Sequence, residues 1–165
     1  MKNKGFTLVE LLVVMAILGV LVTLIAGGFR TAQMRGRDAK RKSDLKEIAN
    51  SLELYLSDHG EYPSSDGGGR VIGCPATTGV CAWGSGEFTD GETVYFKTMP
   101  EDPSSSLDYY YRAFSNDRKF QIYAHLENPK DKNCLQEDCE TAIIPYSCGS
   151  NCNFAVTSAN TTPTE

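Results

Sequence analysis

The sequence predicts an α+β fold, in which one amino-terminal helix of about 50 residues packs on a small antiparallel β-sheet with disulfide-closed loops. Three observations predict it. An apolar run opens the chain, a helix-like pattern without proline continues to residue 59, and the β-rich segments and all six cysteines come later. We divide the chain into a short basic start, a membrane-spanning helix, its amphipathic continuation and a globular head, at residues 1–5, 6–29, 30–59 and 60–165.

Residues 6–29 are long and apolar enough to cross a membrane. Only Thr7, Glu10, Thr23 and glycines interrupt the apolar run. As a helix it would span about 36 Å, against about 30 Å of bilayer hydrocarbon. The run is longer than the apolar region of a secretory signal, and no A-x-A-like cleavage site follows it. Basic residues flank both ends, so charge alone does not set the orientation.

The six cysteines set the orientation instead. Their close pairs are separated by six, four and three residues, unlike the tight pairs of zinc sites. We therefore predict disulfides in an oxidising compartment, with the head outside the inner (cytoplasmic) membrane and Met1 in the cytoplasm. A local Cys74–Cys81 loop is favoured, and the pairing of the other four is left open. The candidates are Cys74, Cys81, Cys134, Cys139, Cys148 and Cys152.

Residues 30–59 continue the helix with one apolar face. Apolar side chains recur three and four residues apart, and polar side chains occupy the opposite side. The helix ends at His59-Gly60, and Tyr62-Pro63 confirms the exit. The predicted stripe is Leu45, Ile48, Leu52, Tyr55 and Leu56, opposite Lys46, Glu47, Asn50 and Glu53.

The head contains several short strand candidates. The clearest is a hairpin of residues 109–114 and 119–126, whose second run alternates apolar and polar residues and so predicts one buried face. Residues 160–165 are expected to fray. The other strand candidates are residues 70–72, 94–97, 141–146 and 154–156.

The start of the chain resembles the class III signal of type IV pilins and type II secretion pseudopilins. The motif is Lys4-Gly5-Phe6-Thr7-Leu8-Val9-Glu10, followed by the apolar run. A looser likeness to major pseudopilins and related pilins extends over residues 37–45, 54–63, 107–112 and 123–127. The amino-terminal motif does not separate a pilus from a pseudopilus.

The resemblance implies a life history for the chain. Residues 1–5 would be a leader that a prepilin peptidase removes between Gly5 and Phe6, and the same enzyme would methylate the amine of Phe6. Copies would then leave the membrane, with an inner-membrane assembly platform as partner, and stack into a cell-surface or periplasmic filament. Their apolar helices would form its core.

Glu10 is the unusual residue of this segment, because a carboxylate at the centre of a bilayer costs about 2.5–3.5 kcal/mol. One reading is that its side chain reaches the nearby cytoplasmic interface. The reading we adopt is assembly: Glu10 lies four residues from Phe6, and the Phe6 amine of a neighbouring copy can pair with it. A copy in the wrong axial register would leave both charges unpaired.

Charge divides the chain into a basic and an acidic part. Residues 30–46 carry seven bases and two acids, a net +5, whereas residues 47–165 carry 7 bases and 18 acids, a net −11. An acidic head argues against nucleic acid as a partner. The basic segment is read either as a solvated helix face near anionic lipid or as a partner for acidic heads of neighbouring copies.

No signature of an enzyme accompanies His59 or His125, so we predict that the chain is not an enzyme; the resemblance implies that it is a structural protein and the substrate of one. Tyr109, Tyr110, Tyr111 and Tyr123 are assigned to packing rather than to a stacking platform. The alternative function is a minor tip or binding subunit for adhesion or DNA uptake.

No cofactor and no metal site are assigned. Calcium is left open, because major pseudopilins as a family bind it in a loop near the carboxyl terminus, although no EF-hand spacing is present. The oxygen ligands on offer are Asp102, Asp108, Asn116, Asp117, Asp131 and Asp138.

Overall fold

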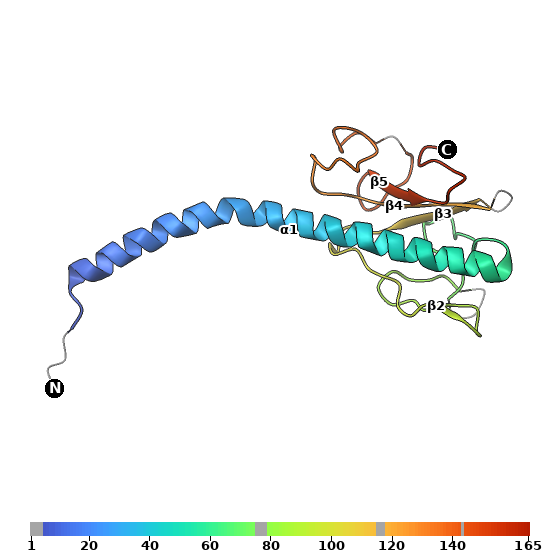
Figure 1. The fold of residues 1–165 in the computed structure, drawn as a ribbon, viewed down its shortest axis with the longest axis horizontal. Helices are drawn as coiled ribbons and strands as arrows, with labels where there is room; N and C mark the ends of the chain where they lie inside the picture. The colour runs from blue at the N-terminus through green and yellow to red at the C-terminus, as the bar shows by residue number, and fades with distance from the viewer. Residues whose placement is uncertain (1–4, 75–78, 115–117, 143) are drawn as a thin grey trace.

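One continuous helix, α1 (Leu8–His59), runs through the molecule and carries the head at its far end (Figure 1). The structure, a computed structural model, describes residues 5–74, 79–114, 118–142 and 144–165, without the side chains of residues 24–27. The helix ends where Gly60 adopts φ 75° and its N–H donates to the carbonyl oxygen of Leu56 at 2.8 Å. Glycine takes this left-handed conformation without the steric cost of a Cβ. The predicted helix of about 50 residues is confirmed.

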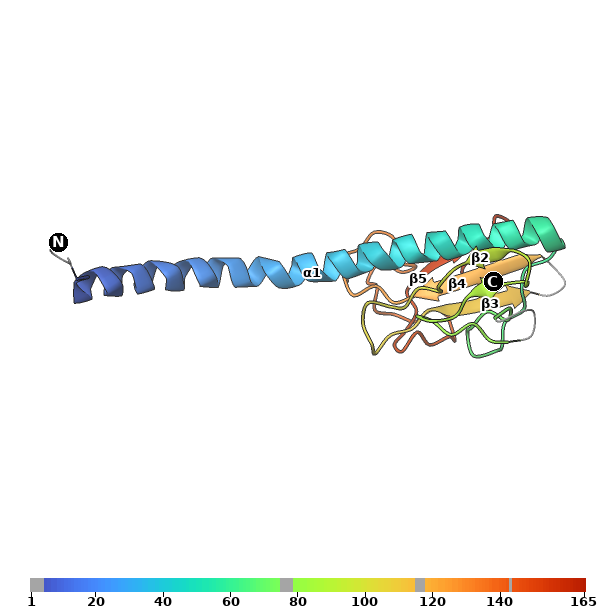
Figure 2. The same cartoon turned by 90° about the horizontal axis from the view of Figure 1, so that it is seen from below.

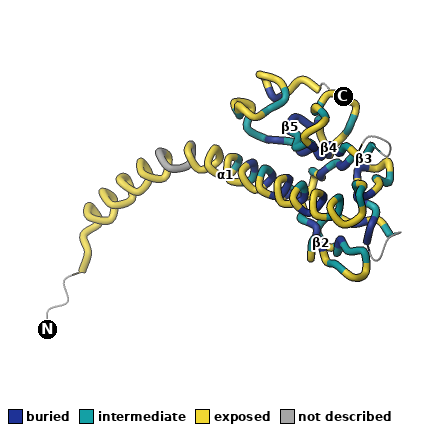
Figure 3. The backbone as a smooth tube through the Cα atoms, turned by 45° about the vertical axis from the view of Figure 1, so that its right-hand side comes forward, coloured by how far each residue is buried: buried dark blue, intermediate teal, exposed yellow. Residues whose placement is uncertain are grey.

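The two halves of α1 have different surroundings (Figure 3). From residue 8 to residue 33 every described side chain is exposed, whereas the later half buries one face against the head. Leu45, Ile48 and Leu52 are completely buried, as the predicted stripe requires. Burying each of these side chains stabilises the fold by about 1.5–3 kcal/mol. This burial stabilises the packing of the helix on the head.

The head is built on a three-stranded antiparallel sheet of order β3-β4-β5, which faces the helix (Figures 1 and 2). Its strands are β3 (Tyr110–Phe114), β4 (Lys119–Ala124) and β5 (Phe154–Thr157). A separate antiparallel pair, β1 (Phe88–Thr89) and β2 (Val94–Phe96), lies beside the helix.

The strands predicted within the three-stranded sheet are correct, whereas those predicted within the cysteine-containing loops are not regular strands. The hairpin and the strand at residues 154–156 are confirmed, and β2 covers most of residues 94–97. Residues 70–72 make only isolated bridges, at Val71 and Ile72. The strand expected at residues 141–146 is wrong for its described residues, which form bends and loop. Strand β1 was not predicted, because two residues are too few to show a pattern.

Strand β4 is buried on both faces, which the predicted alternation did not anticipate. Phe120 and Ile122 face the helix, as expected, but Gln121 and Tyr123 are also completely buried. The carboxyl-terminal segment covers them: the Gln121 amide donates to the Thr162 carbonyl at 2.6 Å, and the Tyr123 hydroxyl to the Pro163 carbonyl at 2.8 Å. Residues 160–165 are therefore docked on the sheet rather than frayed.

All six cysteines form disulfides, and each bridge is local. The predicted Cys74–Cys81 bridge is confirmed. The four cysteines whose pairing was open form Cys134–Cys139 and Cys148–Cys152. The latter bridge packs with Tyr123 and Ile144 in a second small core on the outer face of the sheet.

Candidate assembly site on the helix and at its junction with the head

Helix α1 begins with a capping box that contains Glu10. The Thr7 N–H and hydroxyl donate to Glu10 Oε2 at 2.8 and 2.7 Å, and the Glu10 N–H donates to the Thr7 hydroxyl at 3.3 Å. These reciprocal bonds satisfy backbone donors that a helix start leaves unpaired. The role of Thr7 as the helix cap was not predicted, although a Thr followed three residues later by Glu is the signal of a capping box. Glu10 thus has hydrogen-bond partners within its own chain.

The first half of α1 presents apolar side chains to its surroundings on all sides. Phe6, just before the helix, is 87% exposed, and Phe29 within it is 60% exposed. The helix is the one element in the described part of the chain that is long and apolar enough to cross a membrane, by length and composition. An apolar surface of this extent marks a lipid or protein interface.

At the other end of the exposed half, a buried arginine joins the helix to the head. The Arg41 side chain has no exposed surface. Its Nε and Nη2 donate to the two carboxylate oxygens of Asp102 at 2.7 and 2.8 Å, a two-bond arrangement that is geometrically specific. Nη1 donates to Asp38 at 2.8 Å, and Nη2 also donates to Glu127 at 2.8 Å. Burial alone would lower the pKa of Arg41, but the bonds to Asp102 and Glu127 raise it.

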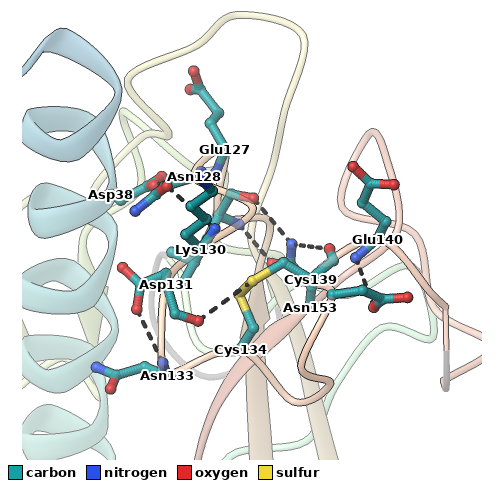
Figure 4. Close-up of a disulfide and its surroundings, with 12 residues drawn as sticks. Asp38, Glu127, Asn128, Lys130, Asp131, Asn133, Cys134, Cys139, Glu140 and Asn153 are labelled. Atoms are coloured by element: carbon teal, nitrogen blue, oxygen red, sulfur yellow. Dashed lines mark hydrogen bonds between the residues drawn. A yellow bond between two sulfur atoms is a disulfide. The ribbon is translucent and has the colours of Figure 1, made fainter. Parts of the chain in front are cut away.

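Asp38 fastens the same helix turn to the loop that follows β4. Its carboxylate accepts the backbone N–H groups of Glu127 and Asn128, both at 2.9 Å. Figure 4 shows Asp38 reaching from the helix toward Asn128. We call Asp38, Arg41, Asp102 and Glu127 the junction cluster.

The loop beyond the junction cluster is held in turn by the Cys134–Cys139 bridge and by Asn153 (Figure 4). Asn153 is buried, and its amide donates to the carbonyls of Leu126 and Cys139 at 3.0 and 2.8 Å. The loop that meets the helix is therefore fixed to the start of β5.

The junction limits both readings of the basic segment to its exposed bases. Four of its seven bases, Arg37, Lys40, Arg41 and Lys42, pair with acids of the same chain. Arg37 pairs with Glu127, and Lys42 with Asp131. Within the described residues, Arg30, Arg35 and Lys46 are exposed and make no ion pair. Sequence reasoning treated these bases as exposed because charged side chains are almost never fully buried unless paired.

Acid should weaken the junction. Hydrogen bonds from Arg37, together with those from Arg41, lower the pKa of Glu127 from 4.5 to about 2. A lowered carboxyl pKa stabilises the fold above the unfolded value and loses that contribution as the pH falls through the folded value. We therefore expect the free energy of unfolding to fall between pH 4.5 and pH 2, measured by denaturant titration of the full chain in detergent. Glu127→Gln should flatten the fall in this window; an unchanged slope would contradict the assignment.

The capping box gives a second prediction. Thr7→Val keeps the shape of the side chain but removes the hydroxyl, at a cost of about 1 kcal/mol to the first turn. We expect amides of the first turn to exchange with solvent about fivefold faster in detergent micelles. The control is Thr23→Val, because the Thr23 hydroxyl donates at 2.8 Å to the Val20 carbonyl inside the helix. Equal first-turn exchange in both variants would show that the capping box does not hold the helix start.

The two histidines occupy structural positions. His59 stacks on Tyr55 with ring centroids 4.1 Å apart, and its Nε2 lies 3.0 Å from Asp90. His125 Nδ1 lies 2.7 Å from the Asn151 carbonyl oxygen. Neither contacts a Ser or Cys nucleophile among the hydrogen bonds of the described residues.

Calcium binding, which the sequence left open, is not tested by the structure. Asn116 and Asp117 lie outside the described residues. Asp102, Asp131 and Asp138 are held by Arg41, Lys42 and Thr141, respectively. Asp108 is exposed. Among the described residues, no group of three or more His, Cys, Asp or Glu side chains is arranged to hold a metal ion.

The tyrosines pack, as predicted. Tyr109, Tyr111 and Tyr123 are at most 2% exposed. Tyr110 is half-buried and stacks on Tyr146 at a centroid distance of 4.7 Å.

These features define a class of protein. A capped apolar helix with an unpartnered first half, whose second half carries a small antiparallel head, is the arrangement of a type IV pilin-like filament subunit. The comparisons give the particular family. Residues 1–26 match the prokaryotic N-terminal methylation motif, and residues 30–133 match the model of type II secretion system protein G. Because this match covers more than half of the chain, the chain belongs to the type II secretion system protein G family.

Individual relatives agree with this assignment. The chain is 30% identical over 103 residues to type II secretion system core protein G of Aeromonas hydrophila. The aligned residues cover 62% of this chain and 68% of the relative. It is 30% identical over 128 residues to the Pseudomonas aeruginosa protein of the same name, covering 74% and 82%. It is also 33% identical over 61 residues to the type IV major pilin protein PilA of Myxococcus xanthus, covering 37% and 28%. No solved structure matches at a significant level.

Proposed function

We propose that this chain is the major structural subunit of a type II secretion pseudopilus, whose copies leave the membrane and assemble through residues 6–29. The observation that carries the proposal is the exposed first half of α1, which has an acid at its start and no cover within the described chain. Membership of the protein G family supports it. A minor tip or binding subunit is not favoured, because the relatives are named core proteins and a major pilin.

Processing comes first in this proposal. A prepilin peptidase cuts between Gly5 and Phe6 and methylates the new amine of Phe6. The match to the methylation motif supports this step, and Gly5 and Phe6 are exposed ahead of the first helical residue, where an enzyme can reach them. The chain acts as a substrate here, and the proposal gives it neither catalysis nor a cofactor.

Glu10 then has different partners in the membrane and in the filament. In the membrane, Thr7 supplies hydrogen bonds to the carboxylate, which reduces the cost of carrying it in an apolar surrounding. In the filament, the positive amine of Phe6 from a neighbouring copy pairs with Glu10 and offsets the remaining charge. Because both partners lie in apolar surroundings, only the matching register satisfies them.

Location follows from the same features. The helix anchors the subunit in the inner membrane, and the three disulfides support placing the head on the oxidising side. An inner-membrane assembly platform is the expected partner that moves copies into a periplasmic or cell-surface filament.

Mass spectrometry of the chain from its native host tests the processing step. We expect a methylated amino-terminal Phe6. A chain that keeps Met1 or Lys2 would overturn processing and leave a plain membrane-anchored domain. Electron microscopy of sheared filaments tests assembly: this chain should be their dominant component.

A further inference from the structure

The face of α1 that meets the head changes character along its length. Buried residues recur three and four positions apart along this face: Asp38, Arg41, Leu45, Ile48 and Leu52. The last three are apolar and pack on the sheet, whereas the first two belong to the junction cluster.

The apolar part of this face does not by itself fix where the head sits along the helix. Hydrophobic burial is non-directional and depends on the area removed from water. Moving the head by one turn, about 5.4 Å, would still bring side chains spaced three and four residues apart onto the sheet. Such a move changes which side chains pack together, but the contacts between the helix and the sheet remain apolar.

The charged part is directional. Arg41 donates four hydrogen bonds to three carboxylates that come from the helix, from the loop after β2 and from the loop after β4. Asp102 also accepts the Ser104 N–H of its own loop at 2.8 Å, which orients the carboxylate toward Arg41. A shift of the head by one turn would leave Arg41 and Asp38 paired only with each other and would bury Asp102 without its cation. Burying a carboxylate without its cation is among the costliest errors a fold can make.

Stability alone does not explain the cluster. Well-packed apolar side chains in place of a buried ion network are often as stable or more so, whereas a single polar group at a buried position can specify register. We infer that the junction cluster is a positioning device: it fixes the height of the head above Glu10, 31 residues or about 46 Å along the helix, so that heads of neighbouring copies meet once Glu10 is paired. This inference rests on the proposed function.

The test removes the buried Arg41–Asp102 pair, and the two carboxylates of the cluster that remain keep hydrogen-bond donors. In the double variant Arg41→Met/Asp102→Leu, Glu127 keeps Arg37 and Asp38 keeps its two backbone donors. The matched control is Lys42→Met/Asp131→Leu, which removes a helix-to-head ion pair outside the cluster. Full-length wild-type, double-variant and control chains are produced in the native host, and their filaments are sheared, counted and imaged by cryo-electron microscopy.

We expect the double variant to melt within about 5 °C of wild type. Its filaments should keep the helical rise of the core, but their head density should be smeared, and their yield should fall at least threefold. The control should match wild type in both. Heads ordered at the wild-type height with normal yield would overturn the inference, and so would a double variant that fails to fold, since the cluster would then act through stability.

The outcome for the wild-type chain separates the two proposals. If wild-type chains assemble and the double variant behaves like them, the inference fails and the proposed function stands. If wild-type chains keep their leader and form no filaments, the proposed function fails and the inference falls with it.

Discussion

Replacement of Glu10 by alanine should leave the helix in the membrane and nearly abolish filaments. In an assembled core the Phe6 amine of a neighbouring copy would then be buried without a partner. Leaving one member of a buried ion pair unpaired costs about 3–5 kcal/mol, which lowers an association constant by more than about a hundredfold. We expect the variant in the membrane fraction at the wild-type level and scarcely any of it in the sheared filament fraction, measured by immunoblot.

Two further substitutions separate the charge of Glu10 from its capping bond. Glutamine at this position can still close a capping box with Thr7, but it carries no charge. Glu10→Gln should therefore keep the slow amide exchange of the first turn and still fail to assemble. Glu10→Val should lose both properties. Normal filaments from Glu10→Val or Glu10→Ala would contradict an assembly role for Glu10. Normal filaments from Glu10→Gln would show that assembly requires the capping bond and not the charge.

The largest loss of stability is expected from Arg41→Ala. This substitution removes the one cation that contacts Asp38 and Asp102 among the described ion pairs, and both carboxylates stay buried. We expect the free energy of unfolding to drop by about 3–5 kcal/mol, since an unpaired buried charge is far more costly than a lost surface contact. The melting temperature of the full chain in detergent, followed by circular dichroism, should fall by roughly 10 °C or more.

The control for Arg41 is an ion pair of the same kind at the surface. Lys97 pairs with Glu87 at 3.2 Å, and their side chains are 81% and 38% exposed. Lys97→Ala should cost at most about 1 kcal/mol. If Arg41→Ala were as mild as Lys97→Ala, the junction cluster would contribute little net energy, and its burial would need another explanation.

The parts of the fold that follow a local period could be predicted. The stripe from Leu45 to Leu52 and the hairpin of β3 and β4 repeat at helical and strand spacing, so neighbours in sequence carry the signal. The capping box of Thr7 and Glu10 is equally local, so it could also have been predicted from the sequence.

The junction cluster could not be predicted, because its members are brought together by the fold. Arg41 is 61 residues from Asp102 and 86 residues from Glu127. Arg41 lies four residues before Leu45, in line with the apolar stripe, but nothing near it in sequence shows which carboxylates of the head would pair with it. The burial pattern of β4 was wrongly predicted for a related reason: its second face is covered by the carboxyl-terminal segment and by the loop of the Cys148–Cys152 bridge, and neither has a periodicity of its own.

The placement of the disulfides has a mechanical consequence. The bridges close loops whose ends are 7, 5 and 4 residues apart, and all of them lie within the head. No bridge therefore ties the head to α1 beyond the chain's own continuation at Gly60. Under tension along a filament, the head would be held to its helix by noncovalent contacts alone: the apolar stripe, the ion pairs and hydrogen bonds such as those of Asp38. It could peel from the end near Arg37 and re-seat once the load is released. The bridges would keep the loops intact through each such cycle.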